Sequence, residues 1–232
     1  MSGFEMFALA GAAAAAGMVN AVAGGGTLIT FPVLLLFGTP AIVANATSTL
    51  ALVIGTTSSV YSFRRQIAEV KPWLKRFLPV SLVGGLAGGI LLTHTQEKVF
   101  AKLVPFLLLF ATVIFLTQGF FRKFAITGEG GSQAPLPRHA FWGAMIFQFS
   151  VSVYGGYFGA GIGILMLSSL AFLGLKDIHQ INALKTYLAF CMNVVAAGLF
   201  IYRDWVRWDY ALAMAGAAII GGYLGARLSL FM

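Results

Sequence analysis

The residue best suited to bind a charged ligand is Lys185, which lies inside an apolar segment. It is six residues from the start of a segment predicted over 179–202, a depth of roughly 9 Å at 1.5 Å per residue. An ammonium group is costly at that depth in an apolar environment and by default marks a functional position. The seven Asp and Glu residues all fall at segment ends or in loops. The ammonium is therefore predicted to bind an anion.

Asn182 extends this candidate site, because it precedes Lys185 by three residues and so shares its helix face. Two other roles for Lys185 stay open. The long side chain could extend to the polar end of its segment, or it could form an ion pair with Asp177.

Two glycine clusters could bind an anion without a charged side chain. Each precedes a short apolar segment, and glycine permits the backbone to break a helix there. The first amides of the following helix lack partners and lie at the positive end of its dipole, which suits an anion. Thr27 could cap the first of these helices. The alternative is that the glycines only let helices pack closely. The candidates are Gly24, Gly25, Gly26 and Thr27 in the first cluster and Gly161 and Gly163 in the second.

The first half of the chain offers hydrogen-bonding side chains where the second half offers a charge. They follow Ala44, near the start of a segment predicted over 41–63, and could bind the oxygens of an oxyanion. The alternative is hydrogen bonding between helices, worth roughly 0.6 kcal/mol per contact. This second role is preferred for Thr49. The candidates for the anion site are Asn45, Thr47 and Ser48.

Composition identifies the environment that must hold these residues. Hydrophobic residues make up 59% of the 232 residues, charged residues 9%, and the mean hydropathy is +0.89. Soluble domains carry roughly 25% charged residues, so a multi-pass protein of the cell membrane is predicted. The net charge of +8 comes mostly from residues between apolar segments, which favours contact with lipid headgroups over nucleic acid.

The sequence contains no pattern for catalysis or for a cofactor. Cys191 is the only cysteine and lies in an apolar run, which excludes an intrachain disulfide and a cysteine-rich metal centre. There is no Ser-His pair suited to hydrolysis, no metal-ligand cluster and no phosphate-binding glycine loop. The expected protein is not an enzyme, has no cofactor and binds no nucleic acid. A homo-oligomer is compatible with the sequence, which leaves the oligomeric state open.

The predicted fold class is all-α, a polytopic membrane helix bundle, because lipid requires each backbone group to be paired within its own segment. Two of the nine apolar segments, 27–37 and 162–175, are too short to cross a hydrocarbon core of about 30 Å. We expect them to be broken or re-entrant helices. The other segments are 6–22, 41–63, 73–93, 99–121, 140–158, 179–202 and 208–230.

An internal repeat relates the two halves of the chain. Several landmarks recur at a separation of 137 residues, and a shared register of this kind is hard to obtain by chance. Two homologous transmembrane repeats are therefore predicted. For the later Gly-Gly-x-x-Gly runs, close helix packing is the preferred role. The matching pairs are Gly24 and Gly161, Gly26 and Gly163, Asn45 and Asn182, and the runs Gly84 to Gly88 and Gly221 to Gly225.

The chain is predicted to divide into a first repeat plus a connector helix over 1–121, a cytoplasmic linker over 122–139, and a second repeat over 140–232. The basic loop 64–76 should also be cytoplasmic, since positive loops tend to stay inside. Charge alone does not decide whether the short segments cross fully. Full crossing makes the repeats inverted, and re-entry makes them parallel. We favour inverted repeats, which are frequent among secondary transporters with broken helices.

At these motifs the sequence resembles the TauE/SafE sulfite exporters and related permeases, over nearly its whole length. The first half differs in having Asn45 and Ala46 where many members have a glycine before Thr-Ser. Membership implies export of sulfite, sulfonates or similar sulfur oxyanions across the plasma membrane. The resemblance rests on the glycine-rich break before a short segment with Pro32 and Gly38, on Ala44-Asn45-Ala46-Thr47-Ser48, on Ile181-Asn182-Ala183-Leu184-Lys185, and on the repeated Gly-Gly-x-x-Gly.

Together these patterns predict a secondary transporter that exports a small sulfur oxyanion, sulfite or an organosulfonate, by alternating access between the two repeats. Its partners would be the small anionic substrate and membrane lipid. Two alternatives stay open. One is an anion channel that uses the same site, and the other is a non-transport role as a membrane assembly factor.

Overall fold

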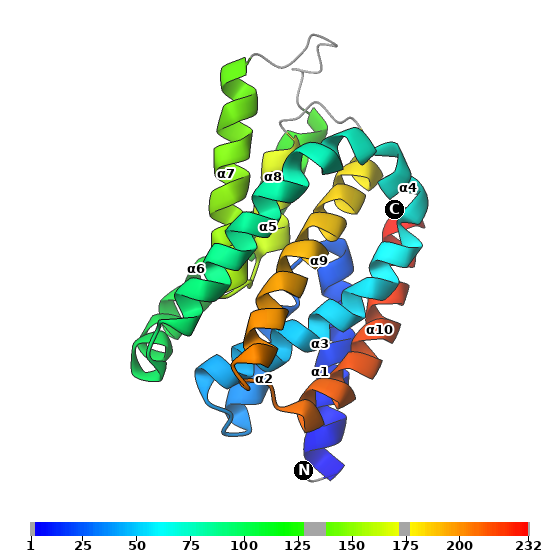
Figure 1. The fold of residues 1–232 in the computed structure, drawn as a ribbon. Coiled ribbons are helices and arrows are strands. Elements are labelled where there is room, and N and C mark those ends of the chain that lie inside the picture. The colour runs from blue at the N-terminus through cyan, green and yellow to red at the C-terminus, as the bar shows by residue number, and fades with distance from the viewer. Residues whose placement is uncertain (1–2, 128–137, 172–176, 232) are drawn as a thin grey trace.

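The computed structural model describes residues 3–127, 138–171 and 177–231. Every regular element in those residues is a helix, so the predicted all-α class is confirmed there. Most of the helices run between the lower and upper ends of one elongated bundle (Figure 1). They are α1 (Gly3–Val22), α2 (Thr27–Leu36), α3 (Ala41–Ser62), α4 (Arg64–Glu69), α5 (Lys71–Thr93), α6 (Glu97–Thr127), α7 (Arg138–Tyr157), α8 (Ile162–Ala171), α9 (Ile178–Tyr202) and α10 (Trp208–Phe231).

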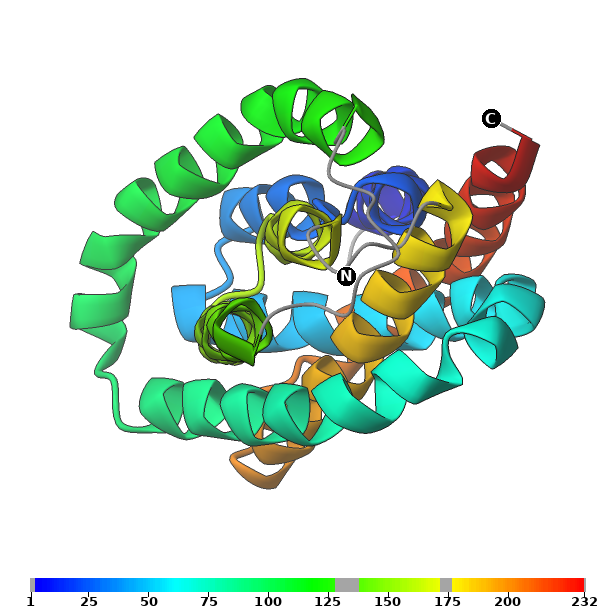
Figure 2. The same ribbon diagram turned by 90° about the horizontal axis from the view of Figure 1, so that it is seen from above.

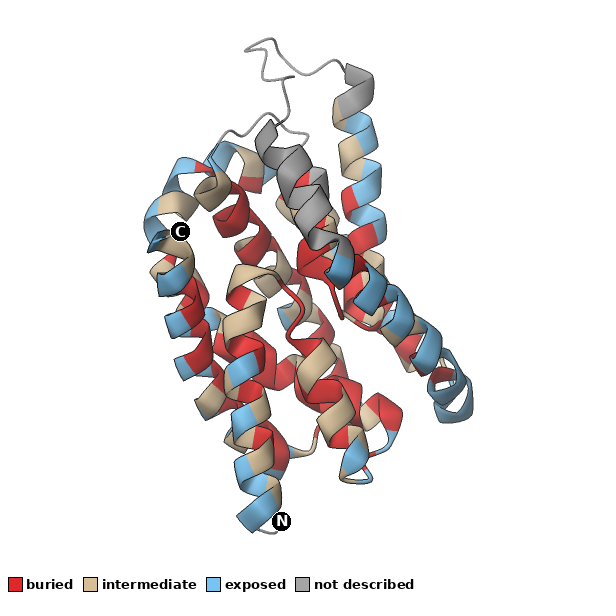
Figure 3. Cartoon of the chain, turned by 180° about the vertical axis from the view of Figure 1, so that it is seen from behind, coloured by how far each residue is buried: buried red, intermediate tan, exposed pale blue. Residues whose placement is uncertain are grey.

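Six of these helices are long and apolar enough to cross a membrane: α1, α3, α5, α6 over Glu97–Leu116, α9 and α10. Their outer faces carry large apolar side chains such as Phe106 and Leu116, which are 71% and 77% exposed. Figure 3 shows buried residues gathered between the helices and exposed ones on the outside. Lipid is the solvent that such a surface requires. The chain is therefore a multi-pass membrane protein.

The two short segments form half-length helices, as expected. Helices α2 and α8 have 10 residues each, so each is about 15 Å long at 1.5 Å per residue. Glycine residues with positive φ precede both helices, Gly24 at 83° and Gly161 at 74°. Gly38, at 72°, follows α2 and turns the chain towards α3. The last residues of the predicted segment 162–175 lie outside the described residues.

Two connections differ from the expected boundaries. The basic loop contains a short helix, α4, between α3 and α5. Helix α6 continues to Thr127 and α7 begins at Arg138, so both ends of the predicted linker 122–139 are helical. Residues 128–137 of that linker lie outside the described part of the chain. At the other end of α6, the Glu97 carboxylate accepts from the Ala41 and Ile42 amides at 2.6 and 3.1 Å. This carboxylate caps α3, where an anion is favourable.

The helices assemble as two bundles that do not coincide with the two halves of the chain. Helix α1 packs against α10, and α10 packs against α3. In the same way α7 packs against α5, and α5 packs against α9. Helix α2 lies on α1 and α3, and α8 lies on α7 and α9. The first bundle is therefore α1, α2, α3 and α10, and the second bundle is α5, α7, α8 and α9. The first bundle therefore contains α10 from the second half of the chain, and the second bundle contains α5 from the first half.

Glycines let these helices approach closely, in the packing role expected for the Gly-Gly-x-x-Gly runs. A Cβ added at Gly221 or Gly225 would overlap the α1 backbone, at Ala14 or Met18. A Cβ added at Gly88 would overlap the α7 backbone at Val153. The α5–α7 and α1–α10 contacts thus use Gly88 and Gly225, which lie 137 residues apart in the sequence.

The first helices of the two halves start at opposite ends of the molecule. Figure 1 shows α1 starting at the lower end, beside the N-terminal label, and α7 starting at the upper end. Helices α3 and α9 pack against each other between the two bundles. Figure 2 shows α6 curving around the outside of the other helices, to which it is joined mainly through contacts with α8 and α3.

Candidate functional site

The two glycine breaks meet at the centre of the molecule. The Gly163 amide donates a hydrogen bond to the Gly24 carbonyl, with an N–O distance of 3.3 Å. A Cβ on either residue would overlap the backbone of the other. Only glycine at both positions allows this approach, because any side chain would push the breaks apart. The short helices α2 and α8 therefore start beside the same point.

The remaining residues of the first break have different roles. Gly25 packs under the Phe115 ring, with its added Cβ 3.0 Å from that side chain. Gly26 is the N-cap of α2 and provides no side-chain hydrogen bond. The expectation that Thr27 caps α2 is wrong, because Thr27 is the first helical residue and the capping position belongs to Gly26. Thr27 instead lines a cavity next to the break.

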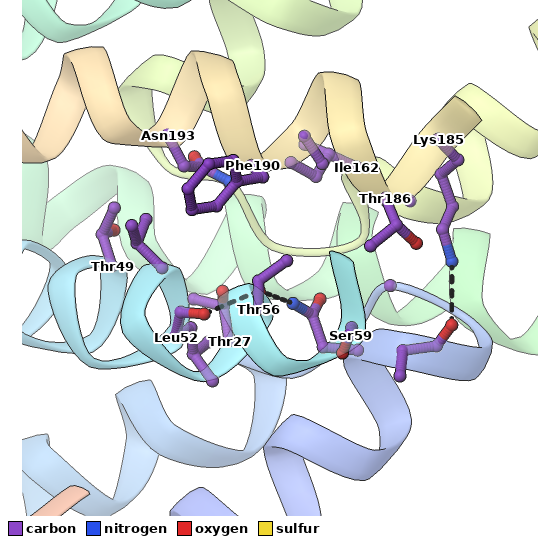
Figure 4. A pocket seen from close by; sticks show the side chains of 17 residues that line it. Thr27, Thr49, Leu52, Thr56, Ser59, Ile162, Lys185, Thr186, Phe190 and Asn193 are labelled. Atoms are coloured by element: carbon purple, nitrogen blue, oxygen red, sulfur yellow. Dashed lines mark hydrogen bonds between the residues drawn. The ribbon is translucent and has the colours of Figure 1, made fainter. Parts of the chain in front are cut away.

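This cavity lies between α3 and α9 and extends to the two glycine breaks (Figure 4). The volume open to water is about 30 Å³, enough for about two water molecules. Lys185 is among its lining residues. The others are Asn20, Ala21, Gly24, Thr27, Thr49, Leu52, Val53, Thr56, Ser59, Gly159, Ile162, Gly163, Thr186, Ala189, Phe190 and Asn193.

Helices α3 and α9 line the cavity with equivalent faces. On each helix the lining positions follow a spacing of three, four and seven residues, which places them on one side. Four of the α3 positions have a lining counterpart on α9 that lies 137 residues later, the separation found in the sequence, whereas Ser59 and Lys185 have none. The four pairs are Thr49 and Thr186, Leu52 and Ala189, Val53 and Phe190, and Thr56 and Asn193.

Lys185 is buried at the cavity wall, with 1% of its surface exposed. Its Nζ donates to the Ala21 carbonyl at 3.4 Å, near the C-terminal end of α1, where the helix dipole favours a cation. Lys185 forms no ion pair with Asp177 in the described part of the chain, and the Asp177 carboxylate accepts from the His179 amide at 2.8 Å, where it caps α9. The side chain does not extend to the molecular surface either.

The two repeated asparagines connect one half of the chain to the other. Asn182 Nδ2 donates to the Ala21 carbonyl of α1 at 3.2 Å and to Ser229 Oγ at 2.9 Å. Asn45 Nδ2 donates to the Tyr157 carbonyl, at the end of α7, at 3.1 Å. Each asparagine thus binds the last turn of the first helix in the opposite half. The Oδ1 atoms of both are buried without a hydrogen-bond partner in the described part of the chain.

Thr47 and Ser48 form contacts between helices and do not line the cavity. The Thr47 hydroxyl accepts from the Arg207 amide at 3.1 Å, just before α10. The Ser48 hydroxyl lies 2.6 Å from that of Thr30 on α2. Asn45 also points towards a neighbouring helix, so none of these three α3 candidates lines the cavity. Thr49 does line it, although a packing role was preferred for Thr49 in the sequence analysis.

Sequence reasoning did not select Thr56, Thr186 or Asn193, and it gave Asn20, just before the first glycine cluster, only as a weaker candidate. Asn20 Nδ2 donates to Thr56 Oγ1 at 3.3 Å, and that hydroxyl donates to the Leu52 carbonyl at 2.7 Å. The Thr186 Oγ1 atom is buried and has no partner within the described residues. The signal that would have found them is a pair of polar residues 137 positions apart, each on the helix face that carries other such residues. Thr49 and Thr186 form one such pair, and Thr56 and Asn193 form another.

The described residues hold no group of three or more His, Cys, Asp or Glu side chains that could bind a metal ion. Cys191, the single cysteine, is unpaired and half-buried on α9. The candidate site therefore consists of one ammonium, hydroxyl groups and amides, which are donors suited to an anion.

Comparison with known proteins relates nearly the whole chain to one group of membrane proteins. A family model described as Sulfite exporter TauE/SafE matches residues 9–232. A probable membrane transporter protein of Haemophilus influenzae is 28% identical over 218 residues, covering 92% of this chain and 80% of the relative. The probable membrane transporter protein ORF9 of a Sinorhizobium species is 27% identical over 226 residues, covering 94% and 81%. The probable membrane transporter protein YfcA of Escherichia coli K12 is 28% identical over 218 residues, covering 93% and 77%. No solved structure matches the chain.

Proposed function

The chain belongs to the sulfite exporter TauE/SafE family, and from this premise we propose that it exports a small sulfur oxyanion, sulfite or an organosulfonate, across the plasma membrane. The substrate would pass through the cavity between α3 and α9. The observation that carries the proposal is the buried Lys185 ammonium, which lines this cavity and has no carboxylate partner among the described residues. A cation held there in low dielectric attracts an anion strongly.

The substrate would bind mainly to side chains in this conformation. The Gly163 amide, at the start of α8, is already bonded to the Gly24 carbonyl. Asn45, Thr47 and Ser48 are occupied with neighbouring helices. The glycine breaks therefore shape the cavity, while Lys185 supplies the charge. Asn182 would hold α1 and α10 in place beside it, because its Nδ2 already donates to the Ala21 carbonyl and to Ser229 Oγ.

We propose further that the two halves are inverted repeats that produce alternating access. Helices α1 and α7 start at opposite ends of the molecule (Figure 1), and the contacts of α1 with α10 correspond to those of α7 with α5. The cavity-lining pairs share one separation along the chain. The moving units would be the first bundle and the second bundle. Each of them contains one helix from the opposite half of the chain, α10 in the first bundle and α5 in the second. Rocking one against the other would open the cavity to either side in turn.

The charge distribution supports export. The basic loop around α4 lies at the upper end of the molecule in Figure 1, which the positive-inside tendency assigns to the cytoplasm. Helix α9 starts at that end, and Lys185 is close to its start. An anion would therefore meet the ammonium from the cytoplasmic side. A membrane potential that is negative inside then favours outward movement by about 2.3 kcal/mol per charge for each 100 mV.

The test has a binding arm and a transport arm. In the first, thermal stabilisation of the purified protein is compared in sulfite, sulfate, taurine, sulfoacetate and chloride, for wild type and Lys185→Ala. Binding to the native state raises apparent stability, so one sulfur oxyanion should stabilise the wild type and not the variant. In the second, the protein in liposomes should give saturable flux and exchange of that anion. Rapid, non-saturating flux would indicate a channel, and neither binding nor flux for any anion would refute the proposal.

A further inference from the structure

The cavity is nearly symmetric in its lining positions but not in its charge. The residue that corresponds to Lys185 at the repeat separation is Ser48, whose hydroxyl is bonded to Thr30 and lies outside the cavity. Figure 4 shows Thr186 and Lys185 towards one end of the cavity and Thr49 and Asn193 towards the other. One end therefore combines a polar side chain with a cation, and the other has polar side chains alone.

Thr186 is the residue of the charged end whose hydrogen bonding is incomplete. Its side chain is buried, with 3% exposed, and its Oγ1 has no partner in the described part of the chain. A buried hydroxyl without a partner costs free energy, and a ligand that accepts from the Thr186 hydroxyl would remove this cost. The other hydroxyls near this end are occupied, since Thr56 donates to the Leu52 carbonyl and Ser59 donates to the Gly222 carbonyl.

The Lys185 ammonium also keeps donor capacity for a ligand. An ammonium has three N–H donors, and within the described residues Nζ makes a long hydrogen bond of 3.4 Å to the Ala21 carbonyl. Lys185 and Thr186 are consecutive and both line the cavity. A ligand with several acceptor oxygens could bind the ammonium with one oxygen and the hydroxyl with another.

We propose that the Thr186 hydroxyl is a substrate-binding donor and that the oxyanion occupies only the Lys185–Thr186 end of the cavity. This inference rests on the proposed function and adds a residue and a position to it. The Thr49–Asn193 end is then a neutral, polar part of the path. The asymmetry follows from a single difference between the repeats, a lysine at 185 where the first half has Ser48.

The test compares the same substitution at the two corresponding positions. Thr186→Val and Thr49→Val each remove one hydroxyl at nearly constant volume, and sulfite binding is measured by titration calorimetry on purified protein. Losing a hydrogen bond to a charged ligand should weaken sulfite binding about ten-fold or more in Thr186→Val. Thr49→Val should bind sulfite within about two-fold of the wild type, since no cation adjoins it. Thr186→Ser, which keeps the hydroxyl, should retain most of the affinity.

Each other outcome has a definite meaning. Equal affinity in Thr186→Val and wild type overturns the role of Thr186. Equal weakening by Thr49→Val and Thr186→Val overturns the one-sided site, while the proposed transport of an oxyanion stands. If wild-type protein binds no sulfur oxyanion, both proposals fail. If Thr186→Val does not fold, comparison of Thr186→Ala with Thr186→Ser decides the same question.

Discussion

At the scale of single residues, the cavity depends on a lysine with two kinds of contact. The Lys185 ammonium binds the Ala21 carbonyl and also lines the cavity. Asn182 donates to the same carbonyl at a shorter distance, 3.2 Å. The carbonyl therefore keeps a partner without the lysine, and the costly buried charge is better explained by ligand binding than by support of α1.

Replacing Lys185 by methionine separates these two roles. Lys185→Met removes the charge at similar volume, and burying an apolar chain costs less than burying a cation. We expect the apparent melting temperature without ligand to be unchanged or higher, and the stabilisation by sulfite to be lost. The measurement is thermal unfolding in detergent with and without sulfite. Lys98→Met, at an exposed position, is the control and should change neither value. A large fall in stability with an intact sulfite response would show that Lys185 is structural.

At the scale of elements, the glycine breaks decide where the short helices start. Gly24 and Gly163 contact each other through their backbones, and Gly24 has a φ of 83°, a region that side chains disfavour. Helices α2 and α8 can therefore both start beside the cavity. Without this contact the first turns of α2 and α8 would separate. The glycine breaks would then no longer close the cavity between α3 and α9.

A single methyl group tests the contact between the breaks. Gly24→Ala should destabilise the protein by roughly 3 kcal/mol or more, because it adds a steric overlap to an unfavourable φ. Gly216→Ala is the matched control. It lies in helix α10 with open space around an added Cβ, so it should be neutral or stabilising by up to about 1 kcal/mol. Unfolding midpoints in detergent compare the two variants. Similar midpoints for both would mean that the breaks can separate at little cost.

At the scale of the whole molecule, the two bundles are the units that we propose to move against each other. The first bundle and the second bundle are each held by close helix contacts at glycines, whereas the cavity lies between them at α3 and α9. The division of the chain at residues 122–139 does not coincide with this boundary, since α5 and α10 belong to the bundle of the opposite half.

Cross-linking distinguishes motion between bundles from motion within one. In a Cys191→Ser background, Thr49→Cys with Asn193→Cys places thiols on α3 and α9, and joining them with a short bifunctional reagent should abolish anion flux in liposomes. Ser81→Cys with Gln148→Cys is the control, since those side chains are 2.9 Å apart on α5 and α7, inside the second bundle. Joining this second pair should leave flux close to that of the uncross-linked protein. Full flux after the first cross-link would contradict rocking of the bundles.

Several features of this protein followed from its sequence alone. Hydrophobic composition identified the membrane, and backbone pairing in lipid then left helices as the expected element. The short segments were recognised by length, and each forms a helix of 10 residues. The depth of Lys185 within its segment also predicted its burial. These properties are local, because they depend on the run of residues around each position.

The tertiary structure alone decided which polar residues of α3 face the cavity. Asn45, Thr47, Ser48 and Thr49 lie within little more than one turn, and successive residues point about 100° apart around a helix. Their spacing therefore shows that the four side chains point in different directions, but it does not show which of them faces the cavity. That choice depends on how α3 packs against α9, α10 and α2, including the close glycine contact of Gly55 with α10. The same reason explains why the sequence did not predict that α5 and α10 each pack in the bundle of the opposite half. Contacts between distant segments decide this placement, and no local sequence pattern predicts such contacts.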